Sequence, residues 1–403
     1  MASGTATPCC SRRCNNIWTW FSRLALSMDK SGAQRQAAYI ITNEDKNMVV
    51  SLAIDKNGLL GDGAMVATGG AGSASIDGST NQTAAVDPLV AQSSLTVAGK
   101  NLFAVNAGSN TLTMFAIDAA DPTKLTMIGK PVQVPGQFPN TVAASQKNKV
   151  VCVGSTGAVA GVSCSSFSSK AGLGAMDDLR PFNLGQTTPP VGPTNTVSQL
   201  FFSEDEKTLF TTVKGDPAVN DKPGFLAAFP VEAACSGGVS ADAVMSTPKD
   251  TLVLFGSSII PGSTDVFVTD ASFGAAVLSV GADLKAETKG RGAVKGQAAT
   301  CWATVSPATN TAFVTDVGVN RLVEMSVDDA TILNEIDLGA NGQSGMIDLK
   351  AAGQMLYVLA PGNNDTRPAV VVLDAKTRKS VQVKDLGSMG VTGRVQGMAI
   401  FGA

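Results

Sequence analysis

The strings DVFVTD (265–270) and TAFVTD (311–316) are nearly identical strand-like runs, and runs of this kind recur along the whole chain. Each consists of β-branched and aromatic residues that stop at a polar side chain, which is typical of a β-strand entering a turn. The other five copies are AYIITN (38–43), NLFAVN (101–106), KVVCVG (149–154), TLFTTVK (208–214) and MLYVLA (355–360). Their ends lie 44 to 63 residues apart. This period predicts one four-stranded sheet per repeat, and therefore an all-β, seven-bladed β-propeller.

Further short strands flank these runs. A leading strand precedes most of them, as in SSLTVAG (93–99) and CWATVS (301–306), and a trailing strand usually follows. The first repeat has no leading strand, whereas VQGMAIFG (395–402) is a leading strand without a repeat of its own. We therefore expect a disordered tail over residues 1–36 and a propeller over residues 37–403, with the C-terminal strand closing blade one. A β-sandwich with extra strands is the alternative.

The composition excludes several classes of function. The 403 residues include 30 Lys plus Arg, 33 Asp plus Glu and no histidine. Without an imidazole there is no Ser-His-Asp triad, no Cys-His pair and no His-ligated zinc or haem. The near-balanced charge argues against a nucleic-acid partner, which requires clustered Lys and Arg. No run of 18 apolar residues occurs, so no membrane-spanning helix is expected. A monomer that binds a small molecule, with no metal and no cofactor, fits these observations.

The cysteines and the N-terminus bear on the compartment. Cys152 and Cys164 flank a loop and could meet across a hairpin, and the sequence leaves open whether they form a disulfide or two buried thiols. Polar residues interrupt NNIWTWFSRLALSM (15–28), which therefore lacks the continuous apolar segment of a signal peptide. A cytoplasmic location is favoured over secretion for that reason. The glycosylation sequons at Asn81 and Asn364 matter only in a secreted protein.

Three long stretches resemble one protein family. AVNAGSNTLTMF (104–115), the stretch DDLRPFNLGQTTPPVGPTNTVSQLFFSEDEKTLFTTVKGD (177–216) and VLFGSSIIPGSTDVFVTDASFGAAVLS (253–279) are similar to fungal 3-carboxymuconate cyclase-like proteins, within the lactonase-type seven-bladed propellers. The resemblance extends from Ala37 to the end. It implies reversible lactonisation, in which a carboxylate adds across a conjugated diene and a proton is transferred. Members that lactonise muconates rely on a histidine, which this chain lacks.

The topology of a propeller brings particular polar residues to one face. The second strand of every blade ends on the same face, and the loops entering the inner strands share it. Lys214, Asp270 and Asn106 are the candidate catalytic residues, because they end second strands. The candidate substrate-binding residues are Asn43, Gln92, Asn140, Asn195, Phe273, Arg291, Trp302 and Asp316. The long connections 69–91 and 183–196 are expected to cover this face.

Each of these residues has a functional and a structural interpretation. Lys214 could hold an anionic oxygen of a substrate, or form a surface ion pair with Asp216. Asp270 and Asp316 could act on a substrate, or bind the backbone of their own loops. Arg291 could bind a carboxylate from a flexible glycine-rich loop, or be a solvated charge. Trp302 and Phe273 could form apolar walls for a conjugated ligand, or pack in the core.

These features predict a cyclase that acts on a small conjugated, oxygenated molecule, as in fungal secondary metabolism. The reaction is either lactonising or a pericyclic closure such as a hetero-Diels-Alder step. Both need orientation and charge stabilisation more than hydrolytic machinery. The alternatives are a non-catalytic secreted or cell-wall propeller and a metal-dependent lactonase.

Overall fold

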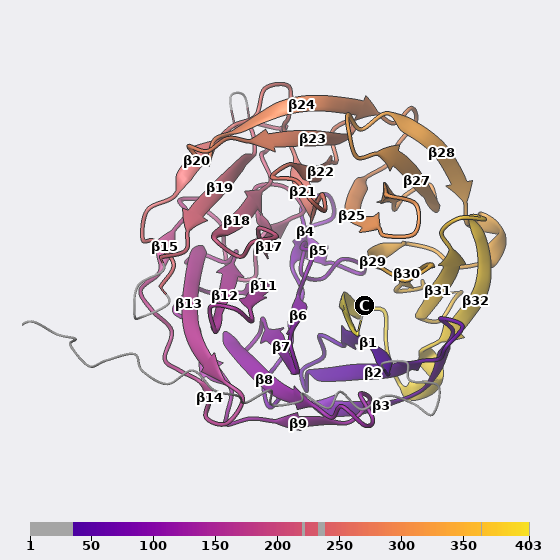
Figure 1. Cartoon of the computed structure of the whole chain (residues 1–403), viewed down its shortest axis with the longest axis horizontal. Helices are drawn as coiled ribbons and strands as arrows, with labels where there is room; N and C mark the ends of the chain where they lie inside the picture. Colours follow the sequence, from indigo (N-terminus) through magenta and orange to yellow (C-terminus); the bar gives the residue numbers. More distant parts are fainter. Residues whose placement is uncertain (1–34, 220–221, 233–237, 364, 403) are drawn as a thin grey trace, which may run out of the picture.

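The computed structural model describes residues 35–402, apart from 220–221, 233–237 and 364. Within them, seven sheets of four or five antiparallel strands follow one another around a ring (Figure 1). This arrangement confirms the predicted all-β propeller. The only helices among the described residues are two 3-10 turns, η1 (Gly339–Asn341) and η2 (Gly387–Met389). Neither is long or apolar enough to cross a membrane.

The blades are described here from the central channel outward. Blade 1 contains β33 (Gln396–Phe401), β1 (Gln36–Ile41), β2 (Met48–Ile54) and β3 (Leu60–Ala67). Blade 2 contains β6 (Leu95–Ala98), β7 (Asn101–Asn106), β8 (Thr111–Ile117), and β9 (Leu125–Met127) with β10 (Val132–Gln133). Blade 3 contains β11 (Pro139–Ser145), β12 (Val150–Ser155), β13 (Gly161–Ser168), and β14 (Gly172–Leu173) with β15 (Arg180–Pro181).

The remaining four blades are formed by strands that are consecutive in sequence. Blade 4 contains β17 (Val197–Phe202), β18 (Thr208–Val213), β19 (Phe225–Pro230) and β20 (Val244–Ser246). Blade 5 contains β21 (Leu254–Ile259), β22 (Val266–Asp270), β23 (Gly274–Val280) and β24 (Ala286–Ala293). Blade 6 contains β25 (Thr300–Ser306), β26 (Thr311–Asp316), β27 (Arg321–Ser326) and β28 (Ile332–Asp337). Blade 7 contains β29 (Ile347–Ala352), β30 (Met355–Ala360), β31 (Ala369–Asp374) and β32 (Lys379–Asp385).

The C-terminal strand closes the ring, as the orphan strand in the sequence predicts. β33 pairs antiparallel with β1, with Ala37 opposite Phe401 and Tyr39 opposite Ala399. This pairing covers an edge that would otherwise expose unpaired backbone groups. The expected N-terminal tail falls almost wholly in residues 1–34, which lie outside the described residues, and the first strand begins at Gln36.

Apolar layers between neighbouring blades form the core. The second strands are almost wholly buried, as in β7 and β30. Their aromatic residues, such as Phe103, Phe267 and Phe313, are fully buried between the blades. The near-continuous apolar runs of the repeats are therefore explained by packing on both faces of each sheet.

Several inner strands contain a shift in pairing register that changes the direction of one side chain. The pairing register shifts between Pro139 and Thr141, between Val197 and Gln199, and between Ile347 and Leu349. The residues skipped by these shifts are Asn140, Ser198 and Asp348, and all three are buried. A bulge of this kind turns an extra residue away from the regular alternation. Polar groups therefore lie along the axis at the start of several inner strands.

The two long connections meet over the channel. β4 (Ile76–Asp77) and β5 (Gln82–Thr83), from connection 69–91, form a hairpin, and β16 (Val191–Gly192), from connection 183–196, pairs with β4 in parallel. Figure 1 shows β4 and β5 inside the ring of blades. The two connections are thus joined to each other by backbone pairing, as the segments of one cover would be.

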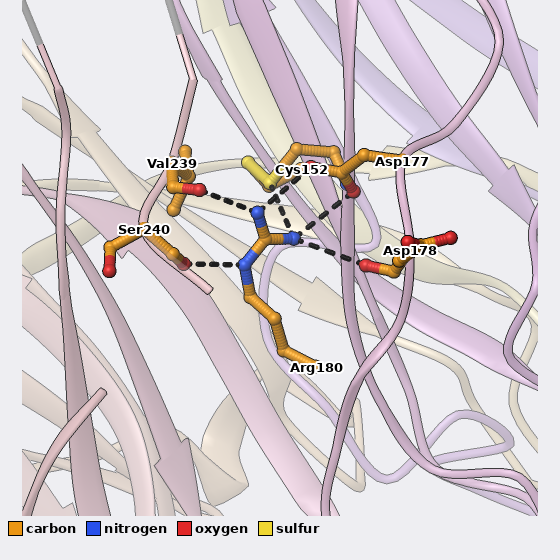
Figure 2. Close-up of a disulfide and its surroundings, with 7 residues drawn as sticks. Cys152, Asp177, Asp178, Arg180, Val239 and Ser240 are labelled. Carbon is orange, nitrogen blue, oxygen red and sulfur yellow. Dashed lines mark hydrogen bonds and ion pairs between the residues drawn. A yellow bond between two sulfur atoms is a disulfide. The ribbon is translucent and has the colours of Figure 1, made fainter. Parts of the chain in front are cut away.

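Cys152 and Cys164 form a disulfide, which resolves the alternatives left by the sequence. They are directly opposite each other in β12 and β13. Figure 2 shows the Arg180 guanidinium beside this disulfide, between Asp177 and the backbone at Val239 and Ser240. Arg180 donates two hydrogen bonds to the Asp177 carboxylate, at 3.1 and 2.8 Å, and one to each of the carbonyls of Val239 and Ser240, at 2.6 Å. The arginine therefore links the disulfide hairpin of blade 3 to the chain that precedes β20 of blade 4.

Candidate functional site

The segment Leu89–Ser93 fills the channel behind the cover. Its backbone is bound by side chains from blades on all sides. Leu89 accepts from Asn140, Val90 from Lys214, and Ala91 from both Trp302 and Gln396. The Gln92 backbone donates to the Ser198 carbonyl and accepts from the Thr141 hydroxyl. We call Leu89–Ser93 the channel plug.

Lys214 is a buried part of this arrangement and does not pair with Asp216. Its ammonium donates to the Val90 carbonyl at 2.7 Å and to the Ser198 hydroxyl at 3.3 Å. It also lies 4.1 Å from the centre of the Phe255 ring, in cation–π geometry. Burial lowers the pKa of Lys214 to about 7, and the charge of Asp87 opposes that shift. The alternative of a surface ion pair with Asp216 is therefore wrong, because the side chain points inward to the plug.

Three of the predicted substrate-binding residues also hold the plug. Asn140 donates to the carbonyls of Leu89 and Val197. The Gln92 side chain crosses the channel and makes two hydrogen bonds with the Ala303 backbone, at 2.8 and 3.1 Å. Trp302 donates its indole N–H to Ala91 and packs edge-on against Phe255. The predicted convergence of polar groups is present, but these groups converge on the protein's own backbone.

The polar residues at the ends of other second strands stabilise local turns. Both Asp270 oxygens accept backbone N–H groups, from Leu252, Val253 and Ser272. Asp316 accepts from Ala298 and pairs with Arg321 at 2.9 Å. Asn106 binds the side chains of Asn47, Thr111 and Thr113. Their hydrogen-bonding capacity is thus used within the fold.

Asn43 is fully buried, with a left-handed φ of 54°, and its side-chain amide has no partner among the described residues. It is separate from the plug.

Arg291 and Phe273 lie away from the channel. Arg291 is an exposed residue of β24, the outermost strand of blade 5, where it lies opposite Ala276. Its guanidinium stacks on the Phe273 ring at 3.8 Å. The expectation of a flexible glycine-rich loop is wrong here, because residues 290–293 pair with residues 274–277 of β23, next to a register shift at Lys289.

A cavity of about 800 Å³ lies above the plug. It is open to solvent on one side and is lined by the β4–β5 hairpin, the segment around Asp87 and Val90, and residues in and around β16. Asn195 is the one predicted site residue that lines it. Asn195 has a left-handed φ of 54° and donates to the Leu184 carbonyl, while its buried Oδ1 has no partner among the described residues.

Asp87 is a titratable group that lines the cavity. Its half-buried side chain lines the cavity, and its Oδ1 accepts from Gln396 at 2.7 Å. Burial raises the pKa of Asp87 to about 7, against the opposing effects of Lys214 and the Gln396 hydrogen bond. The carboxyl therefore keeps its proton to higher pH than an ordinary aspartate, which suits a general acid or base.

The backbone around Asp87 is strained. Asp87, Val90 and Ser93 have positive φ angles of 50°, 48° and 65°. This region is unfavourable for L-residues, and most of all for a β-branched residue such as Val90. Such strain persists only where the surrounding structure imposes it, and it is concentrated at functional sites. Here the plug contacts impose it.

The charged side chains that line the cavity are all acidic. Asp77, Asp87 and Asp216 line it, and no Lys or Arg of the described chain does. Val86 and Val191 add exposed apolar surface at 40% each. The lining therefore favours an uncharged or cationic molecule with an apolar part and disfavours a polyanion.

Sequence reasoning missed Asp87. It lies in the connection 69–91 that was expected to cover the site, next to Pro88. Its only sequence signal is that it is one of two acidic residues in that connection, the other being Asp77. Its pKa depends on Lys214 and Gln396, which are distant in sequence.

No family model and no curated protein sequence matches this chain. Solved structures do. The periplasmic gluconolactonase of Pseudomonas aeruginosa has 13% identity and a TM-score of 0.63, covering 91% of this chain and 98% of that one. A protein from Lactobacillus plantarum has 13% identity and a TM-score of 0.61, covering 91% and 99%. A putative 6-phosphogluconolactonase from Bacteroides uniformis has 14% identity and a TM-score of 0.52, covering 70% and 80%. At these identities the likeness shows a shared fold, and two of the three structures carry lactonase names.

Proposed function

We propose that this protein is a cyclase that closes an oxygen-containing ring in a small conjugated molecule, with Asp87 as the proton-transfer group. The observation that carries the proposal is the carboxyl of Asp87, which faces an 800 Å³ cavity and has a pKa raised to about 7. A group of this kind takes up and returns a proton at neutral pH without a cofactor.

The acidic lining of the cavity restricts the class of substrate that it can bind. A carboxymuconate carries several carboxylates, which Asp77, Asp87 and Asp216 would repel. A neutral hydroxylated molecule with a conjugated carbonyl avoids that repulsion. Its apolar part would lie against Val86 and Val191, and its hydroxyl groups would donate to carboxylates and to the free Asn195 oxygen.

The chemistry is then an internal addition. Ionised Asp87 takes the proton from a substrate hydroxyl as that oxygen attacks the conjugated carbon. The new carbon–oxygen bond closes the ring, and the electron pair of the double bond moves toward the carbonyl. Protonated Asp87 then delivers the same proton to the carbon next to the carbonyl. Product and substrate are isomers, and the carboxylate is regenerated.

Lys214 and Gln396 act as positioning residues in this scheme. Lys214 favours the charged form of Asp87 through space, and Gln396 does so through a hydrogen bond. Without them, burial would keep the carboxyl protonated over a wider pH range.

The test uses a panel of neutral hydroxy-enones beside quinone methides, which close by pericyclic steps without proton transfer. Asp87→Asn should reduce hydroxy-enone closure about 10²–10⁴-fold, the usual contribution of a general acid–base group. Asp216→Asn, which changes a second lining carboxylate, should have a much smaller effect. Equal activity of wild type and Asp87→Asn on every cyclised compound would exclude Asp87 and favour the pericyclic reaction. Turnover of neither class would contradict a cyclase.

The disulfide favours a second candidate. Such bonds persist in oxidising compartments, so a non-catalytic secreted or wall-associated propeller is the competing function. In that case a ligand should bind the cavity with equal affinity in wild type and Asp87→Asn, and emerge unchanged.

A further inference from the structure

The hairpin beside the cavity carries a possible modification signal that the proposed function does not use. Asn81, Gln82 and Thr83 form the acceptor sequence for N-glycosylation, in which a threonine follows two residues after the asparagine. The Asn81 side chain is exposed and hydrogen-bonds no other described residue. Gln82 and Thr83 are exposed as well, in β5. The complete acceptor sequence is therefore accessible in the folded protein.

The local backbone presents Asn81 outward. Its N–H donates to the Asp77 carbonyl at 2.7 Å, which closes the turn between β4 and β5, and its φ of 56° is one that asparagine tolerates. A large group on Asn81 would therefore displace no packed side chain. The other sequon, at Asn364, lies outside the described residues.

An independent observation concerns the compartment. The Cys152–Cys164 disulfide is enclosed, with side chains that are 0% and 3% exposed, and the Arg180 network covers it. Disulfides form in the same oxidising pathway that attaches N-glycans. The disulfide therefore fits folding in the compartment where N-glycans are attached.

We propose that Asn81 carries an N-linked glycan. Asp77, Gly78 and Ser79 of the same hairpin line the cavity, so the glycan stands at its rim. It adds a hydrophilic group to a cover that otherwise exposes Val86 and Val191. This inference is independent of the cyclase, because it rests on the acceptor sequence and the disulfide alone.

The experiment is to secrete the full chain from yeast cells behind a cleavable signal. Peptide mapping by mass spectrometry then reports the disulfide and Asn81 in the same sample. We expect a glycan on Asn81 that an amidase removes, leaving aspartate at that position. Asn81→Gln and Thr83→Ala should each abolish it, whereas Thr83→Ser should retain it.

The disulfide serves as the internal control. An unmodified Asn81 peptide in molecules with an intact Cys152–Cys164 bond would overturn the proposal, since those chains were exposed to the pathway. Modification of Asn364 alone would overturn it too. If either glycan-null variant is not secreted, the wild-type and Thr83→Ser proteins still decide the result.

Discussion

The Gln396 side-chain amide donates to Asp87 Oδ1 at 2.7 Å, across the whole length of the propeller sequence. The same amide nitrogen donates to the Ala91 carbonyl at 2.7 Å, and its oxygen accepts from the Leu89 N–H at 2.8 Å. One side chain of the strand that closes the ring therefore holds the candidate acid and the plug together.

Gln396→Ala should destabilise the protein and alter Asp87. The buried partners left without hydrogen bonds cost about 1–3 kcal/mol in the free energy of unfolding, measured by urea denaturation. The pKa of Asp87 should rise, so the acid limb of the pH–rate profile moves to higher pH. Gln382→Ala, which removes two hydrogen bonds to Leu60 at the outer side of blade 7, should lower stability without moving the profile.

Lys214→Met should shift the pH dependence in the same direction. The positive charge of Lys214 lowers the pKa of Asp87, so its removal raises that pKa above about 7. The ionised form then appears only at higher pH. Because Lys214 also binds Val90, we expect lower stability too, in contrast to the small effect expected of a surface ammonium. Lys222→Met is the control, and an unchanged pH profile in Lys214→Met would contradict the coupling.

Asp348→Asn should stabilise the protein above pH 6. Burial raises the pKa of Asp348 to about 6, and its Oδ2 has no partner among the described residues. Between about pH 4 and 6 the folded state therefore binds more protons than the unfolded state, so stability falls as pH rises through this window. The variant should gain about 1–3 kcal/mol at pH 7.5 and much less at pH 4. Equal gains at both pH values would show that the charge is not responsible.

Removing the disulfide should cost about 2–4 kcal/mol, because the unfolded chain regains its freedom between Cys152 and Cys164. The double variant Cys152→Ala with Cys164→Ala should lose that amount in chemical denaturation. Reductant should lower the stability of the wild type but leave the double variant unchanged. A wild type that is insensitive to full reduction would contradict this expectation.

Much of the fold could be predicted because it is periodic. Repeated runs such as FVTD indicate the second strand of each blade. The unpaired strand VQGMAIFG indicates that the C-terminus closes the ring of blades. The residues of the candidate site were harder to predict from the sequence. The Lys214 ammonium binds the Val90 carbonyl of the plug, and only the tertiary path of the cover determines this partner. Asp87 could not be ranked above Asp77, because its raised pKa comes from burial in the folded protein, opposed by Lys214 of blade 4 and Gln396 of blade 1.

The plug also governs how molecules reach the site. The cavity above it lies at the start of the inner strands, while a separate recess of about 350 Å³, lined by Gln199, Ser257 and Lys350, lies toward their other ends. Val90 of the plug lines the cavity and Ser93 lines the recess, so Leu89–Ser93 separates the two. If the proposed cyclase uses the cavity, its substrate and product share one entrance, and we expect the product to inhibit turnover competitively.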